Sequence, residues 1–282
     1  MIISNFTIYR WKNAGMTNLN VYRLLKYLKK NPEQISLRTM AKIGQVKSIP
    51  DFIERFKSQD VQTLREQFKQ FPSFSILDAC YPVRLKNIYN PPVLLFYQGN
   101  LELLSKQKIA FVGSRNPSID GIKSVQKIIK EMNNHFVVVS GLAKGIDAAS
   151  HIANLKNGGL TIAVIGTGLD TFYPSENRLL QEYLSKKQLL LTEYGPGEKA
   201  LKFHFPERNR IIAGLAKGVV VAQAKIRSGS LITCERAMEE GRDVFAIPGS
   251  IQESYSAGCH HLIQQGAKLI TQGNDILEEY EF

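Results

Sequence analysis

A regular alternation of short apolar runs and amphipathic helical stretches begins near residue 108 and continues to the end of the chain. The apolar runs have the length and the β-branched content of buried strands. They cover residues 109–112, 136–139, 161–165, 189–192, 219–222, 244–247 and 267–270. Strands that alternate with helices in this way predict an α/β fold with a doubly wound, mostly parallel sheet. Ligands of such sheets bind at the carboxyl ends of the strands.

Two further segments precede this alternation. Residues 1–75 predict a small all-helical domain built from short amphipathic pieces. In the segment that follows, Tyr81-Pro82 and Pro91-Pro92 interrupt any helix, and residues 93–97 are expected to form a strand. The predicted organisation is therefore a basic helical domain at 1–75, a connector at 76–107 and an α/β domain at 108–282.

The composition is that of a globular protein, and the charge favours an anionic partner. Of the 282 residues, 44% are hydrophobic and 22% are charged, and the net charge is +11. Residues 1–75 hold 13 Lys and Arg against 5 Asp and Glu, a net of +8, whereas the rest of the chain carries only +3. A nucleic acid is a partner that this charge favours, although charge alone says nothing of the fold.

The turns that follow the predicted strands combine small residues with cations. Glycine lets the backbone approach a ligand closely, Ser and Thr hydroxyls donate to phosphate oxygens, and Arg binds them bidentately. Backbone N–H groups at the start of a helix add to the attraction for an anion. Several such turns at one sheet edge predict a basic, glycine-rich groove for a phosphate backbone. The candidate binding residues are Gly113, Ser114, Arg115, Ser140, Gly141, Lys144, Gly168, Arg208, Asn209 and Arg210.

An aromatic ring beside the groove would add base stacking, which is worth about 1–3 kcal/mol per base. Phe172 and Tyr173 follow the third predicted strand, and Phe172 is the candidate that we add to the binding residues. Packing of the loop against Pro174 is the alternative for both rings, and it is favoured for Tyr173.

The sequence contains no standard nucleotide or metal motif. Gly141-Leu-Ala-Lys-Gly145 lacks the Gly-Lys-Ser/Thr of a P-loop, and Gly166-Thr-Gly168 lacks the third glycine of a dinucleotide turn. The histidines have no Cys or Glu at ligand spacing, and His151 is expected to pack against its neighbours. Asp147 either compensates a helix dipole or orients a cation of the groove. We therefore predict neither a cofactor nor a metal.

Together these segments closely resemble the DNA-processing protein A family, also called Smf. The resemblance covers the chain from about residue 76 to its end. It rests on Gly113-Ser114-Arg115, the stretch from Ser140 to Asp147, Tyr173-Pro174, the stretch from Phe205 to Gly214, and Ser228-Gly229-Ser230. The N-terminal helices resemble the sterile-alpha-motif-like or helix-hairpin-helix-like domain that many members carry.

The resemblance implies an extended Rossmann-like core that binds single-stranded DNA without catalysis. It also implies a protein that protects incoming strands during natural transformation, loads RecA recombinase onto them and acts as a homodimer. Ser114, Arg115, Lys144 and residues 208–210 would then reach the DNA backbone. The expected partners are single-stranded DNA, RecA and a second copy of the chain, with no membrane and no metal involved.

An apolar patch near the C-terminal end is the candidate dimer interface. Its members are Met238, His260, Ile263 and Leu269. Ile263 and Leu269 either complete the core of the α/β domain or form a self-complementary surface between two copies.

Two other functions stay open. A nucleoside-phosphate hydrolase would use a similar sheet and a glutamate beside a Pro-Gly turn, and Glu193 stands just ahead of Gly195-Pro196-Gly197. A protein adaptor is the other alternative, against which the basic strand ends argue. Widely spaced cysteines, no signal-peptide pattern and no apolar run of about 18 residues predict a cytoplasmic protein with reduced thiols.

Overall fold

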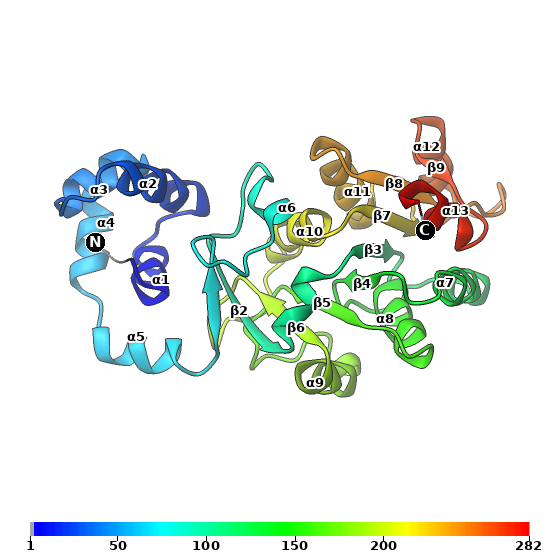
Figure 1. Cartoon of the computed structure of the whole chain (residues 1–282), viewed down its shortest axis with the longest axis horizontal. Helices are drawn as coiled ribbons and strands as arrows, with labels where there is room; N and C mark the ends of the chain where they lie inside the picture. Colours follow the sequence, from blue (N-terminus) through cyan, green and yellow to red (C-terminus); the bar gives the residue numbers. More distant parts are fainter. Residues whose placement is uncertain (1–2, 282) are drawn as a thin grey trace.

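Five short helices build the N-terminal domain in the computed structural model, which describes residues 3–281 (Figure 1). Each helix begins at a Ser, Thr or Asp whose side chain accepts a backbone N–H of the first turn. The helices are α1 (Asn5–Asn13), α2 (Asn18–Lys30), α3 (Leu37–Gly44), α4 (Ile49–Lys57) and α5 (Val61–Phe68). The amphipathic pieces that the sequence predicts are residues 21–28, 36–43, 50–56 and 61–68, and they overlap α2, α3, α4 and α5 but not α1.

The rest of the described chain folds around one nine-stranded sheet, with the strand order β1-β2-β6-β5-β4-β3-β7-β8-β9. Pairs among β3 to β9 are parallel, whereas β2 pairs antiparallel with both β1 and β6. The strands are β1 (Ser73–Ser75), β2 (Leu94–Gly99), β3 (Lys108–Gly113), β4 (Val137–Ser140), β5 (Thr161–Ile165), β6 (Leu189–Thr192), β7 (Gly218–Ala222), β8 (Asp243–Ala246) and β9 (Lys268–Leu269). The predicted doubly wound, mostly parallel sheet is confirmed.

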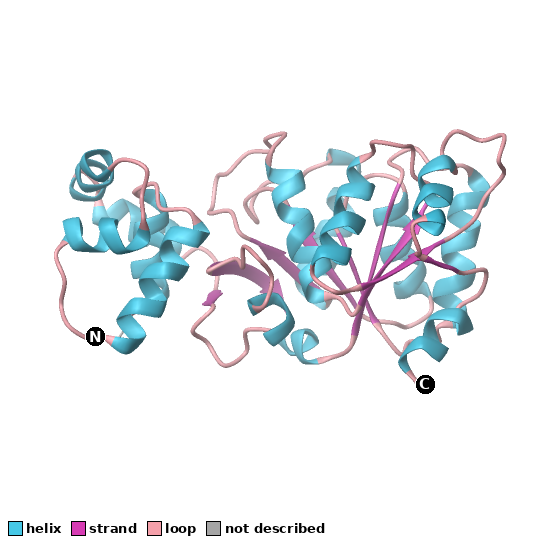
Figure 2. Ribbon diagram, turned by 90° about the horizontal axis from the view of Figure 1, so that it is seen from above, coloured by secondary structure: helices cyan, strands magenta, loops and turns pink. Residues whose placement is uncertain are grey.

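Helices cover both faces of this sheet, as Figures 1 and 2 show. Side chains alternate along each strand, so Ile109 and Phe111 face the layer of α7 and α8, while Ala110 and Val112 join the core beneath α10 and α11. The remaining elements are α6 (Val83–Lys86), α7 (Ile119–Glu131), α8 (Ile146–Lys156), α9 (Arg178–Lys187), α10 (His204–Leu215), α11 (Gly229–Glu239), α12 (Ala257–Gln264) and α13 (Asn274–Leu277), with 3-10 turns η1 (Leu101–Ser105), η2 (Ser175–Asn177) and η3 (Glu278–Tyr280).

The helical domain docks on the antiparallel edge of the sheet. Tyr9 of α1 and Phe68 of α5 both pack on Phe96 of β2, with ring centroids 5.6 and 5.7 Å away. Ser73–Ser75, which the sequence analysis assigned to the helical domain, forms β1 and pairs with β2. One continuous apolar core therefore joins the two parts of the chain.

Candidate nucleic-acid interface

The carboxyl ends of β3 and β7 meet at the switch point of the sheet. β3 lies between β4, the next strand in sequence, and β7, to which the chain returns after β6. The connections that follow β3 and β7 therefore leave toward opposite faces, and sheets of this kind bind their ligands in the crevice between two such connections. The Ser114 N–H donates to the Gln223 carbonyl at 2.7 Å, which joins the two turns at the base of this crevice.

Arg115 is an exposed cation of this crevice. Its guanidinium lies 5.6 Å from the centre of the Phe205 ring at the start of α10, within the range of a cation–π contact. It forms no ion pair with any residue between 3 and 281. Ser114 beside it is partly exposed, and its Oγ accepts the Asn116 N–H at 3.1 Å. Both side chains are placed where a ligand could reach them.

The structure corrects two further predicted contacts, Ser140 at the end of β4 and Arg208 on α10, because both are buried. The Ser140 hydroxyl is inaccessible and donates to the Phe111 carbonyl at 2.6 Å. Arg208 is 4% exposed, and its Nη1 donates to the Val164 carbonyl of β5 at 2.6 Å. A Cβ at Gly141 would lie 1.7 Å from that Nη1, so the turn requires glycine to pass over the guanidinium. Ser140 and Arg208 therefore stabilise this turn from the interior of the protein.

The other glycines of the predicted groove also lie in tight places. A Cβ at Gly113 would come within 2.0 Å of the Ala222 carbonyl, and one at Gly168 within 2.6 Å of the Gly195 carbonyl. These glycines let neighbouring strands and turns approach one another. Gly141 and Gly168 are themselves buried, whereas Gly113 is partly exposed.

Lys144 and Phe172 are exposed and already have neighbours on the surface. The Lys144 ammonium pairs with the Glu176 carboxylate, and the hydrogen bond from Lys144 lowers the pKa of Glu176. The Phe172 ring is 38% exposed, and the Arg178 guanidinium lies 4.8 Å from its centre. Both residues remain accessible to a ligand at the ends of β4 and β5.

Arg210 faces the other way, and its prediction as a DNA contact is corrected too. Its Nη2 pairs with the buried carboxylate of Glu193, which also accepts a hydrogen bond from Asn18 at 2.6 Å and lies 3.5 Å from the Lys12 ammonium. Burial, the largest influence, acts to raise the pKa of Glu193, but the charges of Arg210 and Lys12 outweigh it and lower the pKa. Asn209, next to Arg210, donates to the Gly229 carbonyl at 3.3 Å.

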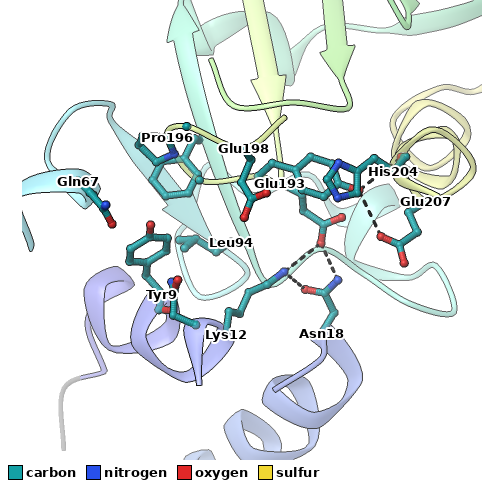
Figure 3. A pocket seen from close by; sticks show the side chains of 15 residues that line it. Tyr9, Lys12, Asn18, Gln67, Leu94, Glu193, Pro196, Glu198, His204 and Glu207 are labelled. Carbon is teal, nitrogen blue, oxygen red and sulfur yellow. Dashed lines mark hydrogen bonds and ion pairs between the residues drawn. The ribbon is translucent and has the colours of Figure 1, made fainter. Parts of the chain in front are cut away.

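This arrangement also bears on the hydrolase alternative. Glu193 is 8% exposed and is held ionised by three groups, so it is poorly suited to accept a proton from a substrate. Lys12 and Asn18 come from the helical domain, and Figure 3 shows both side chains pointing at the Glu193 carboxylate. The glutamate therefore serves the contact between the two parts of the chain.

Two polar residues of α8 lie in the interior. The His151 ring bonds the Thr161 hydroxyl, and burial, followed by the charge of Arg208, lowers the pKa of His151 to about 3. The imidazole is therefore neutral, as expected for a packing histidine. Burial raises the pKa of Asp147, which the charge of Arg208 opposes, and the Asp147 carboxylate accepts the Ala143 N–H at 3.3 Å.

The structure adds exposed residues that the sequence analysis did not choose. Lys225 and Arg227 lie in the turn after β7, the strand that pairs with β3, and both are exposed. Lys202 and Phe203 lie in the loop before α10, and Phe203 is 59% exposed. The signal in the sequence was the mixture of lysine and aromatic residues in 199–205, which is typical of surfaces that bind single strands.

A cleft of about 660 Å³ lies where the helical domain meets the carboxyl end of β6 (Figure 3). Tyr9 and Lys12 line it from α1, and Glu198 and Glu207 line it from the sheet side. Glu198 and Glu207 are exposed and line the cleft, whereas the exposed Lys199 and Lys202 do not line it, so the negative charge is confined to the cleft. A phosphate backbone is not attracted there.

The predicted dimer residues lie at the β8–β9 end of the sheet. Met238 on α11 and Leu269 on β9 are 39% and 47% exposed. Ile263 of α12 is partly buried and packs against the core, and the His260 ring bonds the Gly249 carbonyl at 3.0 Å. Exposed apolar side chains at an open sheet edge leave room for a partner.

Between residues 3 and 281, no group of three or more His, Cys, Asp or Glu side chains is arranged to hold a metal ion. Over the same range, no helix has the length and apolar character needed to cross a membrane.

Comparison with known proteins identifies the family. Residues 73–281 match the family described as DNA recombination-mediator protein A, and residues 3–64 match the DNA processing protein A sterile alpha motif domain. The chain belongs to the DNA processing protein A family. The match to the sterile alpha motif domain covers α1 to α4 and the first turn of α5, and this is one of the two domain types that the resemblance suggested.

Relatives in this family cover most or all of the chain. The chain is 58% identical over 282 residues to DNA processing protein DprA of Streptococcus pneumoniae, with both chains fully covered. It is 46% identical over 233 residues to DNA processing protein DprA of Bacillus subtilis, which covers 82% of this chain and 75% of the relative.

Solved structures of the family support the fold. The X-ray structure of the Streptococcus pneumoniae protein superposes with a TM-score of 0.98 and 58% identity over the whole of both chains. The Helicobacter pylori protein, whose structure is described as giving insight into a unique single-stranded DNA binding mode, has a TM-score of 0.67 and 27% identity. It covers 74% of this chain and 96% of its own.

Proposed function

We propose that this chain binds single-stranded DNA without sequence preference at the switch point between β3 and β7, and that it does no chemistry on the strand. The observation that carries the proposal is Arg115, an exposed guanidinium that lies beside an aromatic ring and pairs with no carboxylate of residues 3–281. Lys225 and Arg227 in the turn after β7 add charge. The description of the Helicobacter pylori relative supports the choice of ligand.

We assign DNA contacts to those predicted residues that are exposed or partly exposed. Ser114, Arg115, Lys144 and Phe172 reach the strand with their side chains, and Gly113, which is partly exposed, offers backbone. Ser140, Arg208 and Arg210 support the site from inside the protein, because the Ser140 hydroxyl, the Arg208 Nη1 and the Arg210 Nη2 are bonded to other groups of the chain. Binding of this kind is mainly electrostatic and weakens steeply as the salt concentration rises.

The wider role that we propose is the one that the resemblance to the DNA-processing protein A family implies. The chain would protect incoming strands during natural transformation in the cytoplasm and load RecA onto them, without a cofactor or a metal. It would act as a homodimer through Met238, His260, Ile263 and Leu269. The exposure of Met238 and Leu269 near an open sheet edge supports this interface.

Arg115→Ala tests the binding site. We expect affinity for a labelled single strand of mixed sequence to fall on the order of tenfold or more, because a charge-assisted contact is lost. Fluorescence polarisation measures the affinity, and circular dichroism verifies the fold. Arg55→Ala, which removes an exposed arginine of α4, is the matched control and should bind normally. Unchanged affinity of folded Arg115→Ala, or turnover of the strand or of added nucleotides, would overturn the proposal.

Leu269→Glu tests the wider role. Placing a charge on the proposed interface should convert a dimer into a monomer in size-exclusion chromatography with light scattering. In the same preparation, capture of RecA by the wild type on single-stranded DNA is the readout for loading. An intact Leu269→Glu dimer contradicts the interface, and no capture of RecA by the wild type contradicts the loading role.

A further inference from the structure

The positive charge of the helical domain is concentrated in one part of it. Residues 18–47, which include α2 and α3, contain seven Lys and Arg and a single acidic residue, Glu33. Residues 48–75, which include α4 and α5, contain four of each sign. The charge excess of the domain is therefore largely a property of the α2–α3 hairpin.

The α2 helix separates an apolar face from a cationic one. Leu24 and Leu28 lie on the buried face and pack into the core. Arg23, Lys26 and Lys30 follow one another at helical spacing on the opposite face, and all three are exposed. No acidic residue occurs in α2.

The α3 helix extends this surface. It runs antiparallel to α2, because Asn20 at the start of α2 donates to the carbonyl of Gly44 at the end of α3 at 2.8 Å. Arg38 and Lys42 lie one turn apart on α3 and are exposed. Figure 1 shows the two helices side by side at the N-terminal extremity of the molecule. We name the set formed by Arg23, Lys26, Lys29, Lys30, Arg38 and Lys42 the cationic hairpin.

Nothing within the described chain neutralises the cationic hairpin. None of its members forms an ion pair with a carboxylate of residues 3–281. The Lys26 ammonium instead lies 4.5 Å from the centre of the Tyr22 ring. Like charges held this close repel one another and raise the local potential, which a polyanion relieves.

Two features favour a single strand of DNA as that polyanion. Tyr22 is partly exposed and Tyr27 is 38% exposed, so aromatic faces stand among the cations, and unpaired bases can stack on them. A duplex hides its base faces from such rings. An acidic peptide would need apolar anchors, and Tyr27 is the only large hydrophobic residue of α2 and α3 that is exposed.

The strand cannot run straight from the switch point to the cationic hairpin. Glu198 and Glu207 at the cleft of Figure 3 are exposed, and the cleft lies where the helical domain meets β6. Negative side chains there repel a phosphate backbone. A flexible single strand can loop past this region and reach both cationic surfaces.

We propose that the cationic hairpin binds the phosphate backbone of a second segment of the same single strand that the switch point holds. This proposal rests on the proposed function of the sheet edge. A strand long enough to reach both surfaces is then held more tightly than a short one, because binding of the second segment becomes intramolecular.

The test compares strand lengths. Arg23→Gln/Lys26→Gln/Lys30→Gln removes one cationic face and keeps good helix formers in α2. Lys123→Gln/Lys130→Gln/Lys156→Gln is the control, since it removes the same charge from exposed positions of α7 and α8. Both are titrated at several NaCl concentrations with oligo-dT of about 8 nucleotides, enough for one surface, and with oligo-dT several times longer.

We expect the α2 variant to bind the long strand on the order of tenfold more weakly, with a salt dependence that is shallower by about 2 in log–log slope, and to bind the short strand normally. The control variant should match the wild type at both lengths. Unchanged long-strand affinity and slope in the α2 variant overturn the inference. So does a variant that loses duplex binding alone, or that weakens short and long strands equally.

The failure of this inference is separable from failure of the proposed function. Arg115→Ala should weaken both the short and the long strand, because the switch point contacts each. If Arg115→Ala has its effect and the α2 variant has none, only the cationic hairpin is excluded. If Arg115→Ala has no effect, the sheet edge itself is excluded.

Discussion

The two ends of the sheet's carboxyl edge hold similar residues in opposite ways. At the switch point, Arg115 faces solvent and pairs with no carboxylate of the described chain. At the β6 end, Arg210 is turned inward by Glu193, and the exposed charged side chains that line the cleft are carboxylates, Glu198 and Glu207. The sheet edge is thus cationic at the switch point, whereas the cleft at the β6 end is acidic.

The helical domain accounts for much of this difference. Lys12 and Asn18 reach Glu193 from the α1–α2 region, and Tyr9 packs against β2 beside them. Docking of this domain buries the ions at the β6 end, where burial makes their pairing obligatory. The switch point has no such cover, so its cations remain free to meet a ligand.

The largest expected effect is a loss of stability at the β6 end of the sheet edge, which the helical domain covers. Glu193→Gln leaves Arg210 and Lys12 without their buried counterion, and we expect the free energy of unfolding to fall by about 3–5 kcal/mol. Urea unfolding followed by the fluorescence of Trp11, the single tryptophan and a buried residue of α1, measures it. Glu182→Gln, in an exposed pair with Arg178, should cost under about 1 kcal/mol. A loss as small in Glu193→Gln as in this control contradicts the structural role.

The same ion group predicts a pH dependence of stability. The pKa of Glu193 lies below its ordinary 4.5, so the folded state favours the ionised carboxylate. This contribution is complete above pH 4.5 and is lost as the pH falls through the lowered pKa. The wild type should therefore lose stability more steeply in acid than Glu193→Gln does. Parallel losses in the two proteins would show that Glu193 is not the group that titrates.

Much of the fold was readable from the sequence because local patterns determine it. Apolar runs of four or five residues, separated by capped helices, mark β3 to β8 without reference to distant contacts. α1 was missed, although Ile8 and Trp11 are fully buried, because its apolar residues at positions 6, 8, 9 and 11 do not follow the i, i+3, i+4, i+7 spacing of an amphipathic helix. β1 was missed because only its pairing with β2 makes it a strand.

The sequence did not predict whether each cation of the predicted groove faces solvent or the protein interior. Arg115, which follows Gly113-Ser114, and Arg208, which lies in the stretch from Phe205 to Gly214, were both predicted to bind the strand, yet Arg115 is exposed and Arg208 is 4% exposed. What buries Arg208 is a carbonyl on β5 and a turn at Gly141, which are distant in sequence. Such partners are determined by the tertiary fold. Residue type and spacing therefore predict the groove, but they do not predict which of its residues are buried and which are exposed.

The smallest expected effect is a change in DNA affinity at the switch-point end of the sheet edge, which the helical domain does not cover. It tests whether Lys144 faces the strand. Glu176→Gln removes the carboxylate that Lys144 pairs with on the surface, so the lysine and the groove become more positive. Because exposed pairs are worth only about 0–1 kcal/mol, we expect single-strand affinity to rise about two- to fivefold with little change in stability. Fluorescence polarisation at low salt measures the gain.

A matched control separates this local effect from net charge. Glu239→Gln makes the same charge change in an exposed pair with Arg236 on α11 and should leave affinity within about twofold, because charges beyond a Debye length of about 10 Å are screened. An equal gain in both variants would mean that only the total charge matters. If the affinity of Glu176→Gln for the single strand does not rise, Lys144 is not part of the binding surface. The proposed binding site at the switch point would then consist of Arg115 and the turn after β7.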